Sequence, residues 1–224
     1  VHSSDSLATL ATRMVFRGDT NRAEELFVAA LAHDSTCVPA LAGLGEIMIR
    51  RGDVADGLRR FDIAEELQPD AGHQSFGRGL VAERAGEHQS AFEEFMSAFS
   101  DDRRNPAYAA AVGRNYREST QRWNARQMHR RAISADPTYA PALIQLARYH
   151  ESETEYEKAA PLFRDYIAVV PTDVEAALAC ATTYLELDST TRARRVLMSI
   201  QHRLQPEHRT DYELAKNFTK TKLA

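Results

Sequence analysis

The feature that most constrains this chain is an internal period of about 34 residues. Three series of equivalent positions repeat at this spacing. The first holds small residues: Ala11, Gly45, Gly79, Gly113, Ala147 and Ala181. The second is also small: Ala23, Gly57, Ala91, Ala125, Ala159 and Ala193. The third is bulky: Phe27, Phe61, Phe95, His129, Phe163 and Leu197. A fixed period of this length predicts stacked copies of one structural unit rather than a single closed core.

Each unit is predicted to contain two amphipathic helices joined by a turn. Glycine marks the turn in the first three units, and the later units replace it: Gly18, Gly52, Gly86, then Thr120, Thr154 and Asp188. Small residues are expected where the two helices cross closely, because a bulky side chain would separate their axes. The bulky series is expected to fill the space between helix layers. A proline follows some of the second helices and stops them, at Pro69, Pro137 and Pro171.

This combination of small, bulky and proline positions at a period of about 34 residues resembles the tetratricopeptide repeat (TPR) family, especially at residues 50–70 and 155–173. The resemblance implies an all-α fold, a right-handed superhelical solenoid of six helix pairs over residues 4–207. The repeats are predicted at 4–37, 38–71, 72–105, 106–139, 140–173 and 174–207. The third repeat departs from the family pattern, with Ser75 and Arg78 where apolar residues are usual.

Residues 208–224 are predicted to form a C-terminal capping helix that covers the last repeat. Its expected apolar face carries Tyr212, Leu214, Ala215 and Phe218. The alternative interpretation is the first helix of a seventh repeat.

In the TPR family the first helices of the repeats line a concave groove. The resemblance places six candidate partner-binding residues there: Phe76, Leu80, Arg114, Arg117, Ile144 and Arg148. The apolar members are expected to be exposed, and the arginines would grip carboxylates with their planar guanidinium groups. The predicted partner is therefore a protein or peptide segment with apolar anchors and acidic character. Alternatively, Arg114 and Arg148 pair internally with Glu118, Glu151 or Glu83.

A second basic feature lies in residues 103–131, where eight arginines and one glutamate give +7 in a chain of net charge −4. Arg122, Arg126 and Arg130 are four residues apart and form one stripe, on the convex side in this family. The stripe would bind an acidic protein surface, RNA or anionic lipid, or it is a solvated face balanced by Asp101 and Asp102. Nucleic acid is disfavoured because no aromatic ladder accompanies the stripe. Trp123 is expected to pack inside.

The chain contains no sequence motif for catalysis or for binding a phosphate group. The predictions are therefore no catalytic residue, no cofactor and no metal site. Cys37 and Cys180 lie several repeats apart and are expected to be unpaired, buried residues. His129 and His150 fall at core positions. They would form a pH-sensitive contact or half a metal site, or they are neutral core histidines.

The sequence therefore predicts a non-enzymatic scaffold that holds another protein. A weaker resemblance, to TPR assembly factors and lipoproteins of bacterial pilus and secretion systems, implies a role in assembling such a machine. It also predicts a lipid-bearing cysteine in a leader upstream of Val1. The alternatives are a substrate-targeting or regulatory module of a larger enzyme, and an RNA or anionic-surface binder acting through the convex arginines. No apolar run is long enough to span a membrane. The location stays open between the cytoplasm and, after removal of a leader, the periplasm or outer membrane.

Overall fold

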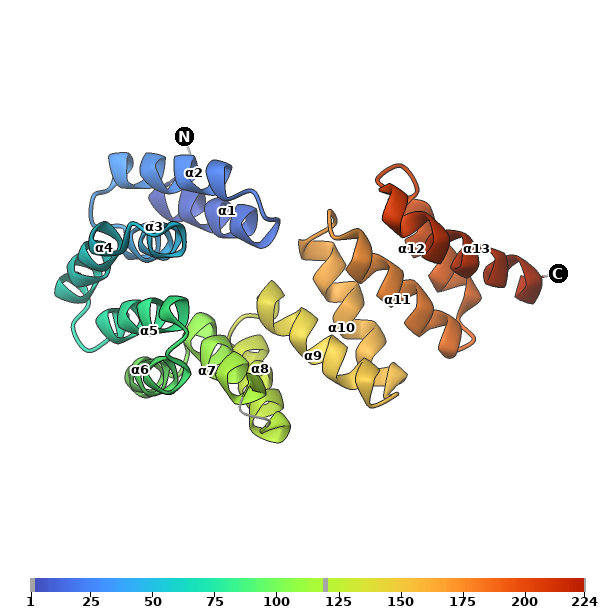
Figure 1. Ribbon diagram of the computed structural model, residues 1–224. Helices are drawn as coiled ribbons and strands as arrows, with labels where there is room; N and C mark the ends of the chain where they lie inside the picture. Colours follow the sequence, from blue (N-terminus) through green and yellow to red (C-terminus); the bar gives the residue numbers. More distant parts are fainter. Residues whose placement is uncertain (1–2, 119–120, 224) are drawn as a thin grey trace. The chain divides into compact units, whose positions relative to one another are not determined.

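The computed structural model describes residues 3–118 and 121–223 and, within them, all side chains except those of residues 117, 118, 218 and 220–223. This part of the chain forms thirteen α-helices and one short 3-10 helix, with no strand (Figure 1). The predicted all-α fold of consecutive helix pairs is therefore confirmed. None of the described helices is both long and apolar enough to cross a membrane.

The chain divides into two compact units, residues 1–137 and 138–224. The first unit holds four helix pairs: α1 (Ser4–Phe16), α2 (Thr20–His33), α3 (Val38–Arg51), α4 (Val54–Leu67), α5 (His73–Ala85), α6 (His88–Asp101), α7 (Pro106–Glu118) and α8 (Arg122–Ala135). Within this unit, α1, α3 and α5 line the inner side of the stack, and α2, α4 and α6 lie outside them (Figure 1). The second unit holds α9 (Ala140–Ser152), α10 (Tyr156–Val169), α11 (Val174–Glu186), α12 (Thr190–Ile200), η1 (Pro206–His208) and α13 (Arg209–Leu223).

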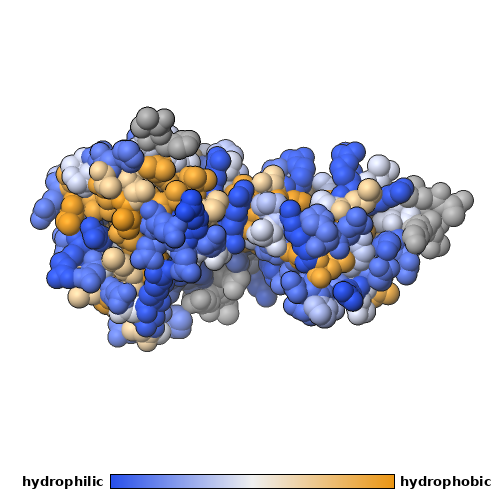
Figure 2. All heavy atoms as spheres, turned by 90° about the horizontal axis from the view of Figure 1, so that it is seen from above, coloured by the Kyte–Doolittle hydropathy of each residue, from blue (hydrophilic) through white to orange (hydrophobic). Residues whose placement is uncertain are grey.

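The first repeat carries apolar residues on its outer surface. Leu10 of α1 and Val28 of α2 are 40% and 52% exposed. Figure 2 views the first unit from this side and shows apolar residues gathered on it. Leu44, which is the residue equivalent to Leu10 in the second repeat, is only 2% exposed. The same position in the repeat is therefore buried on α3 and partly open on α1.

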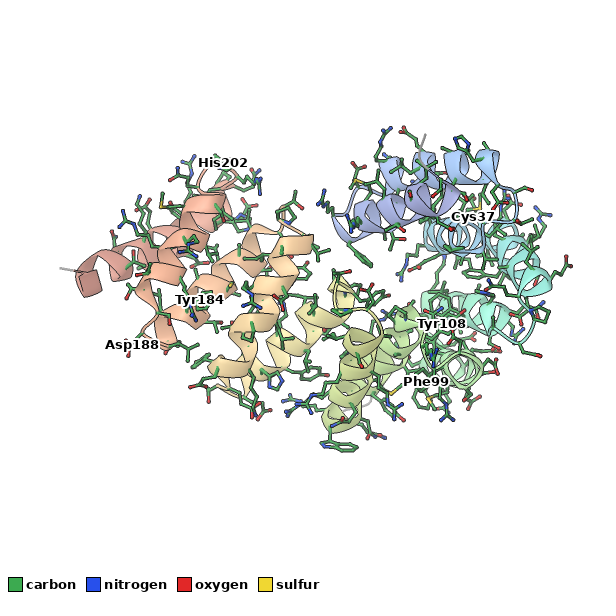
Figure 3. All side chains as sticks on the ribbon, turned by 180° about the vertical axis from the view of Figure 1, so that it is seen from behind. Cys37, Phe99, Tyr108, Tyr184, Asp188 and His202 are labelled. Carbon is green, nitrogen blue, oxygen red and sulfur yellow. The ribbon has the colours of Figure 1, made fainter. Side chains whose placement is uncertain are left out.

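The turn inside each repeat adopts a left-handed backbone conformation. The φ angles are 79° at Gly18, 112° at Gly52 and 78° at Gly86. Thr154 and Asp188 occupy the same place with φ angles of 56° and 52° (Asp188 is labelled in Figure 3). Glycine adopts this conformation without steric cost, whereas other residues enter it only as single, mildly strained positions. The predicted turn positions are confirmed for these five repeats, and Thr120 lies outside the described residues.

The two helices of a repeat approach most closely at the small-residue series. A Cβ atom at Gly57 would lie 2.9 Å from the carbonyl oxygen of Gly45 and 2.6 Å from Cγ1 of Ile49. Such an atom at Gly79 would lie 2.6 Å from the ring of Phe95. These distances are shorter than van der Waals contact, so α3 crosses α4, and α5 crosses α6, where no side chain fits. The prediction that small residues mark the helix crossings is confirmed.

The bulky series forms the interior of the stack, as predicted. Its members have exposed fractions of 0–2%: Phe27, Phe61, Phe95, His129, Phe163 and Leu197. Burying an aromatic or leucine side chain contributes roughly 1.5–3 kcal/mol. The five apolar members of this series therefore supply a repeating contribution to stability, and His129 takes the equivalent place in the fourth repeat.

The unusual residues of the third repeat form a polar network. The Ser75 hydroxyl lies 3.1 Å from that of Ser97. The Arg78 guanidinium donates to Glu94 at 2.9 Å and to the Ser75 hydroxyl at 3.1 Å. Hydrogen bonds and an ion pair thus replace the apolar contacts expected between α5 and α6.

The C-terminal helix α13 packs against α11 and α12. Tyr212 and Ala215 are each 5% exposed, and Thr219 is 3% exposed. The prediction for Leu214 is wrong, because this side chain is 65% exposed. The buried stripe follows residues 212, 215 and 219, and a helix places residue 214 about 100° away from residue 215. The side chain of Phe218 lies outside the described part.

Candidate partner-binding site

The first unit contains an open cleft with a volume of about 470 Å³. It lies where the C-terminal parts of α3, α5 and α7 come together with the start of α6. Its lining comes from four helices and includes three arginines: Arg50, Leu80, Glu83, Arg84, His88 and Arg114. We refer to this set of residues as the arginine cleft.

The end of α3 positions Arg84 in the cleft. The Arg84 guanidinium donates through Nη1 to the backbone oxygen of Arg50, at 3.0 Å. Carbonyl groups in the last turn of a helix lack helical partners and carry partial negative charge, so they attract cations. Gly52 leaves room for this approach, because a Cβ atom there would lie 3.1 Å from Nη2 of Arg84. Arg50 and Arg84 are separated by one full repeat and hold the same position on successive first helices.

Arg114 forms the opposite side of the cleft and pairs with Glu83. Its Nε and Nη2 atoms both lie 2.7 Å from Oε1 of Glu83. The two side chains are 33% and 24% exposed, and ion pairs of this kind contribute about 0–1 kcal/mol. Among the three acids considered from the sequence, the structure selects Glu83 as the internal partner of Arg114. A weak pair of this kind can be exchanged for a carboxylate from a binding partner.

The arginine cleft keeps a positive charge in excess. Arg50 pairs with Glu46 at 2.9 Å and Arg114 with Glu83, which leaves the charge of Arg84 uncompensated. Within the described part of the chain, Arg84 bonds to a neutral carbonyl and to no carboxylate. Guanidinium groups bind carboxylates in a planar, two-point geometry. The cleft is therefore suited to an acidic side chain or a C-terminal carboxylate.

Burial corrects the expectation for two of the apolar groove residues. Phe76 and Leu80 are only 6% and 3% exposed, so neither presents an apolar surface to a partner. The ring of Phe76 packs between other aromatic rings, with centroids 6.0, 5.5 and 4.8 Å from those of Phe61, Phe95 and Tyr108. Figure 3 shows Tyr108 on α7, the helix that covers this cluster. Leu80 still lines the arginine cleft.

The remaining predicted groove residues do not line this cleft. Ile144 and Arg148 belong to the second unit, where Ile144 packs against the apolar core. Arg148 is exposed and pairs with Glu175 at 2.8 Å, an acid that the sequence interpretation did not consider. Burial raises the pKa of Glu151, and the charge of Arg148 opposes this shift. The side chain of Arg117 lies outside the described residues.

The basic stripe lies on α8, the second helix of the fourth pair. The inner side of this helix is buried through Ala125, Met128, His129 and Ala132. Arg122 and Arg130 are exposed and Arg126 is half-buried. The expectation that Trp123 packs inside is wrong, because its side chain is 70% exposed. The buried residues define one face of α8, and Trp123, the second residue of this helix, lies outside that face.

The two core histidines belong to different units. His129 is 1% exposed, and a Cβ atom at Gly113 would lie 2.9 Å from its ring. His150 is 3% exposed, and its Nδ1 atom lies 2.5 Å from Oε2 of Glu155. Lys158 donates to the other oxygen of Glu155 at 2.6 Å. No group of three or more His, Cys, Asp or Glu among the described residues is arranged to hold a metal ion.

Sequence reasoning missed three members of the arginine cleft, namely Arg50, Arg84 and His88. A signal was present, because Arg50 and Arg84 recur at the period of the chain. It was not recognised because each arginine stands one residue after a position that the TPR resemblance assigns to the groove. Both also lie in the last turn of their helices. Of the predicted groove residues, the structure brings Leu80 and Arg114 together in this cleft.

Comparisons with known proteins agree with this fold. Residues 44–106 match the sequence profile of the tetratricopeptide repeat. No curated protein matches the chain in sequence. Among solved structures, the chain is similar to YrrB, described as a TPR protein with an unusual peptide-binding site. The identity is 19%, with 85% of this chain and 97% of that chain covered and a TM-score of 0.54.

PilF and PilW are also similar in structure. For PilF of Pseudomonas aeruginosa the identity is 13%, the coverage 96% of both chains and the TM-score 0.59. For PilW, described as a widely conserved type IV pilus biogenesis factor, the identity is 19%, with 92% of this chain and 97% of that chain covered and a TM-score of 0.54. At such identities the likeness shows the TPR fold alone.

Proposed function

We propose that this chain is a non-enzymatic scaffold that holds an acidic segment of a partner protein in the arginine cleft. The TPR fold suggests a protein–protein interaction role, since stacked helix pairs expose an extended surface to partners. The observation that carries the proposal is Arg84. It is held at the end of α3 by a carbonyl group and keeps its charge available to an incoming carboxylate.

Binding would begin at the charge of Arg84 and then involve Arg50 and Arg114, the other two arginines of the cleft. A carboxylate that accepts from Arg84 replaces solvent at an exposed guanidinium, and a hydrogen bond to a charged group contributes about 1.5–3 kcal/mol. A second acid of the partner would compete with Glu83 for Arg114, whose internal pair is weak. The expected ligand is therefore a segment with more than one acidic residue.

We further propose that this activity serves the assembly of a multiprotein complex, such as a bacterial pilus or secretion machine. The support is the similarity in fold to PilF and PilW. In this proposal residues 4–207 act as six repeats, and residues 208–224 cover the last one.

A binding experiment with matched variants tests the cleft. The probe is a fluorescein-labelled peptide with several glutamates, measured by anisotropy beside an analogue in which every glutamate is glutamine. We expect the wild-type chain to bind the glutamate peptide and Arg84→Glu to weaken binding at least about tenfold, equivalent to ~1.4 kcal/mol. Arg195→Glu, at an exposed arginine of α12, is the control and should leave binding unchanged.

Equal binding by wild type and Arg84→Glu would reject the cleft as the site. Once the cleft is verified, affinity capture from the native extract with both forms identifies the natural partner. A protein retained by wild type and lost by Arg84→Glu assigns the pathway. Capture of a pilus or secretion component would support the assembly role, and capture of an unrelated protein would reject it.

A further inference from the structure

The only tryptophan of the chain is exposed on a basic helix. Trp123 lies in the first turn of α8, and 70% of its surface is exposed. Exposed large apolar side chains often mark interaction sites, and tryptophan and arginine are the residues most enriched at the energetic centres of protein interfaces. The position of Trp123 next to several arginines therefore needs an explanation beyond folding.

The charge around Trp123 is of one sign. The fourteen residues of α8 include four arginines and no Asp or Glu: Arg122, Arg126, Arg130 and Arg131. Arg126 and Arg130 follow Trp123 by three and seven residues, so a helix places all three on one side. Arg131 lies over the ring of Phe99 of α6, 5.9 Å from its centroid (Phe99 is labelled in Figure 3).

Two acids of α6, the helix that Arg131 contacts, are engaged with other groups. Glu94 accepts from Arg78 at 2.9 Å, and Glu93 accepts from Gln89 at 2.6 Å. These bonds hold both carboxylates toward residues of α5 and α6. Because α8 carries four arginines and no acid among its fourteen residues, this face is complementary to an acidic surface.

We infer that the exposed face of α8, formed by Trp123, Arg126 and Arg130, binds an acidic surface of a second partner protein. In this complex the indole of Trp123 enters an apolar pocket of the partner, and the arginines pair with carboxylates around that pocket. Single-stranded RNA fits less well, because stacking platforms use several aromatic rings and this face has one.

A membrane surface also fits less well. Helices that lie in the membrane interface insert a whole apolar face, and the apolar face of α8 is already buried through Ala125, Met128 and Ala132. Trp123 alone would enter the lipid. A protein pocket can enclose one indole ring completely, so the observed single aromatic residue favours a protein partner.

This surface is separate from the arginine cleft within the first unit. None of the residues that line the cleft comes from α8. The chain would therefore hold two partners at once, one through the first helices and one through α8, and would act as a bridge. The inference goes beyond the proposed function and does not depend on it, because each surface has its own residues and its own variants.

A phage-displayed peptide library selected on the wild-type chain tests the inference. Counter-selection on a Trp123→Ala/Arg126→Glu variant removes peptides that bind elsewhere. We expect the remaining peptides to combine Asp or Glu with a large apolar residue. A synthetic, tryptophan-free form of a selected peptide should bind wild type at least about tenfold more tightly than it binds the single variants Trp123→Ala and Arg126→Glu. Arg84→Glu should bind it as wild type does, so that failure of the arginine cleft and failure of this surface are distinguishable.

Fluorescence provides an independent readout, because Trp123 is the only tryptophan. Binding of the selected peptide should shift its emission to shorter wavelength and protect it from quenching by acrylamide. The same measurement is made with phosphatidylglycerol vesicles and with poly(U) RNA. A shift with vesicles or RNA but with no selected peptide would overturn the inference in favour of that ligand. Failure to isolate any peptide that depends on Trp123 would also overturn it. Circular dichroism of each variant verifies that the helices remain folded.

Discussion

Replacing Gly57 by alanine sets two effects of opposite sign against each other. In an exposed helix interior this change stabilises by about 1 kcal/mol, because glycine is the more flexible residue. Here the added Cβ atom would lie 2.6 Å from Cγ1 of Ile49, 2.9 Å from the oxygen of Gly45 and 3.1 Å from the nitrogen of Ile49. Two of these three atoms belong to the backbone of α3, so no change of rotamer relieves the contact with them.

The steric effect is expected to dominate. Overpacking a close contact costs about 1–3 kcal/mol, and the rigid backbone of α3 places Gly57→Ala in the upper part of that range. After subtraction of the gain in helix propensity, we expect a net loss of about 1–2 kcal/mol. For a chain of this size each kcal/mol corresponds to about 2–4 °C in melting temperature. Because stability in a repeat array is spread over neighbouring units, the loss should be concentrated in α3 and α4.

Thermal melting followed by circular dichroism, with hydrogen exchange over α3 and α4, measures this effect. Asp62→Ala, at an exposed position in the same helix, is the control. It improves helix propensity without a close contact and should raise the melting temperature slightly. If Gly57→Ala also stabilised the protein, the closeness of α3 and α4 at this crossing, and with it the interpretation of the small-residue series, would be refuted.

Three further predictions follow from single contacts. Gly113→Leu should lower the melting temperature by more than Arg126→Ala does, because a side chain at Gly113 would meet an imidazole ring of α8 at 2.9 Å; equal melting temperatures would contradict this. Hydrogen bonds from Lys158 and then from a buried histidine lower the pKa of Glu155 from 4.5 to about 2. The unfolded chain therefore binds more protons in that interval, and the stability from this group is present above pH 4.5 and lost as the pH falls toward 2. Glu155→Gln should destabilise the protein at pH 7 and flatten the dependence of melting temperature on pH in this window, which melting curves at several pH values measure. Burial raises the pKa of Cys180 to about 12, so this thiol should resist iodoacetamide at pH 8 until the protein is unfolded, as followed by mass spectrometry; rapid labelling of the folded chain would show that the second unit opens there.

The sequence predicted the helix pairs well because their constraints are steric and local. A left-handed turn and a close helix crossing restrict the residues at a few positions, and those restrictions recur once in every repeat. Even where Thr154 and Asp188 replace glycine, the period identified the turn positions correctly.

Exposure was predicted less well, because it depends on the neighbouring side chains as much as on position in the repeat. Phe76 has the register of a groove residue, yet the ring of Tyr108 on the next first helix lies against it. Trp123 has the size of a core residue, yet it falls outside the buried stripe of α8. The arginine cleft depends on a contact between Arg84 and a backbone oxygen, and backbone partners leave no pattern in the residue types.

The equivalent placement of Arg50 and Arg84 implies that α3 and α5 set a fixed spacing between two cationic positions. Packed helix axes lie about 8–10 Å apart, and an extended chain advances about 3.3 Å per residue. A segment that crosses from α3 to α5 would therefore meet these two cationic positions about three residues apart. A partner with two acids about three residues apart would therefore match this pair of arginines, and a segment of equal charge but different spacing would match it less well.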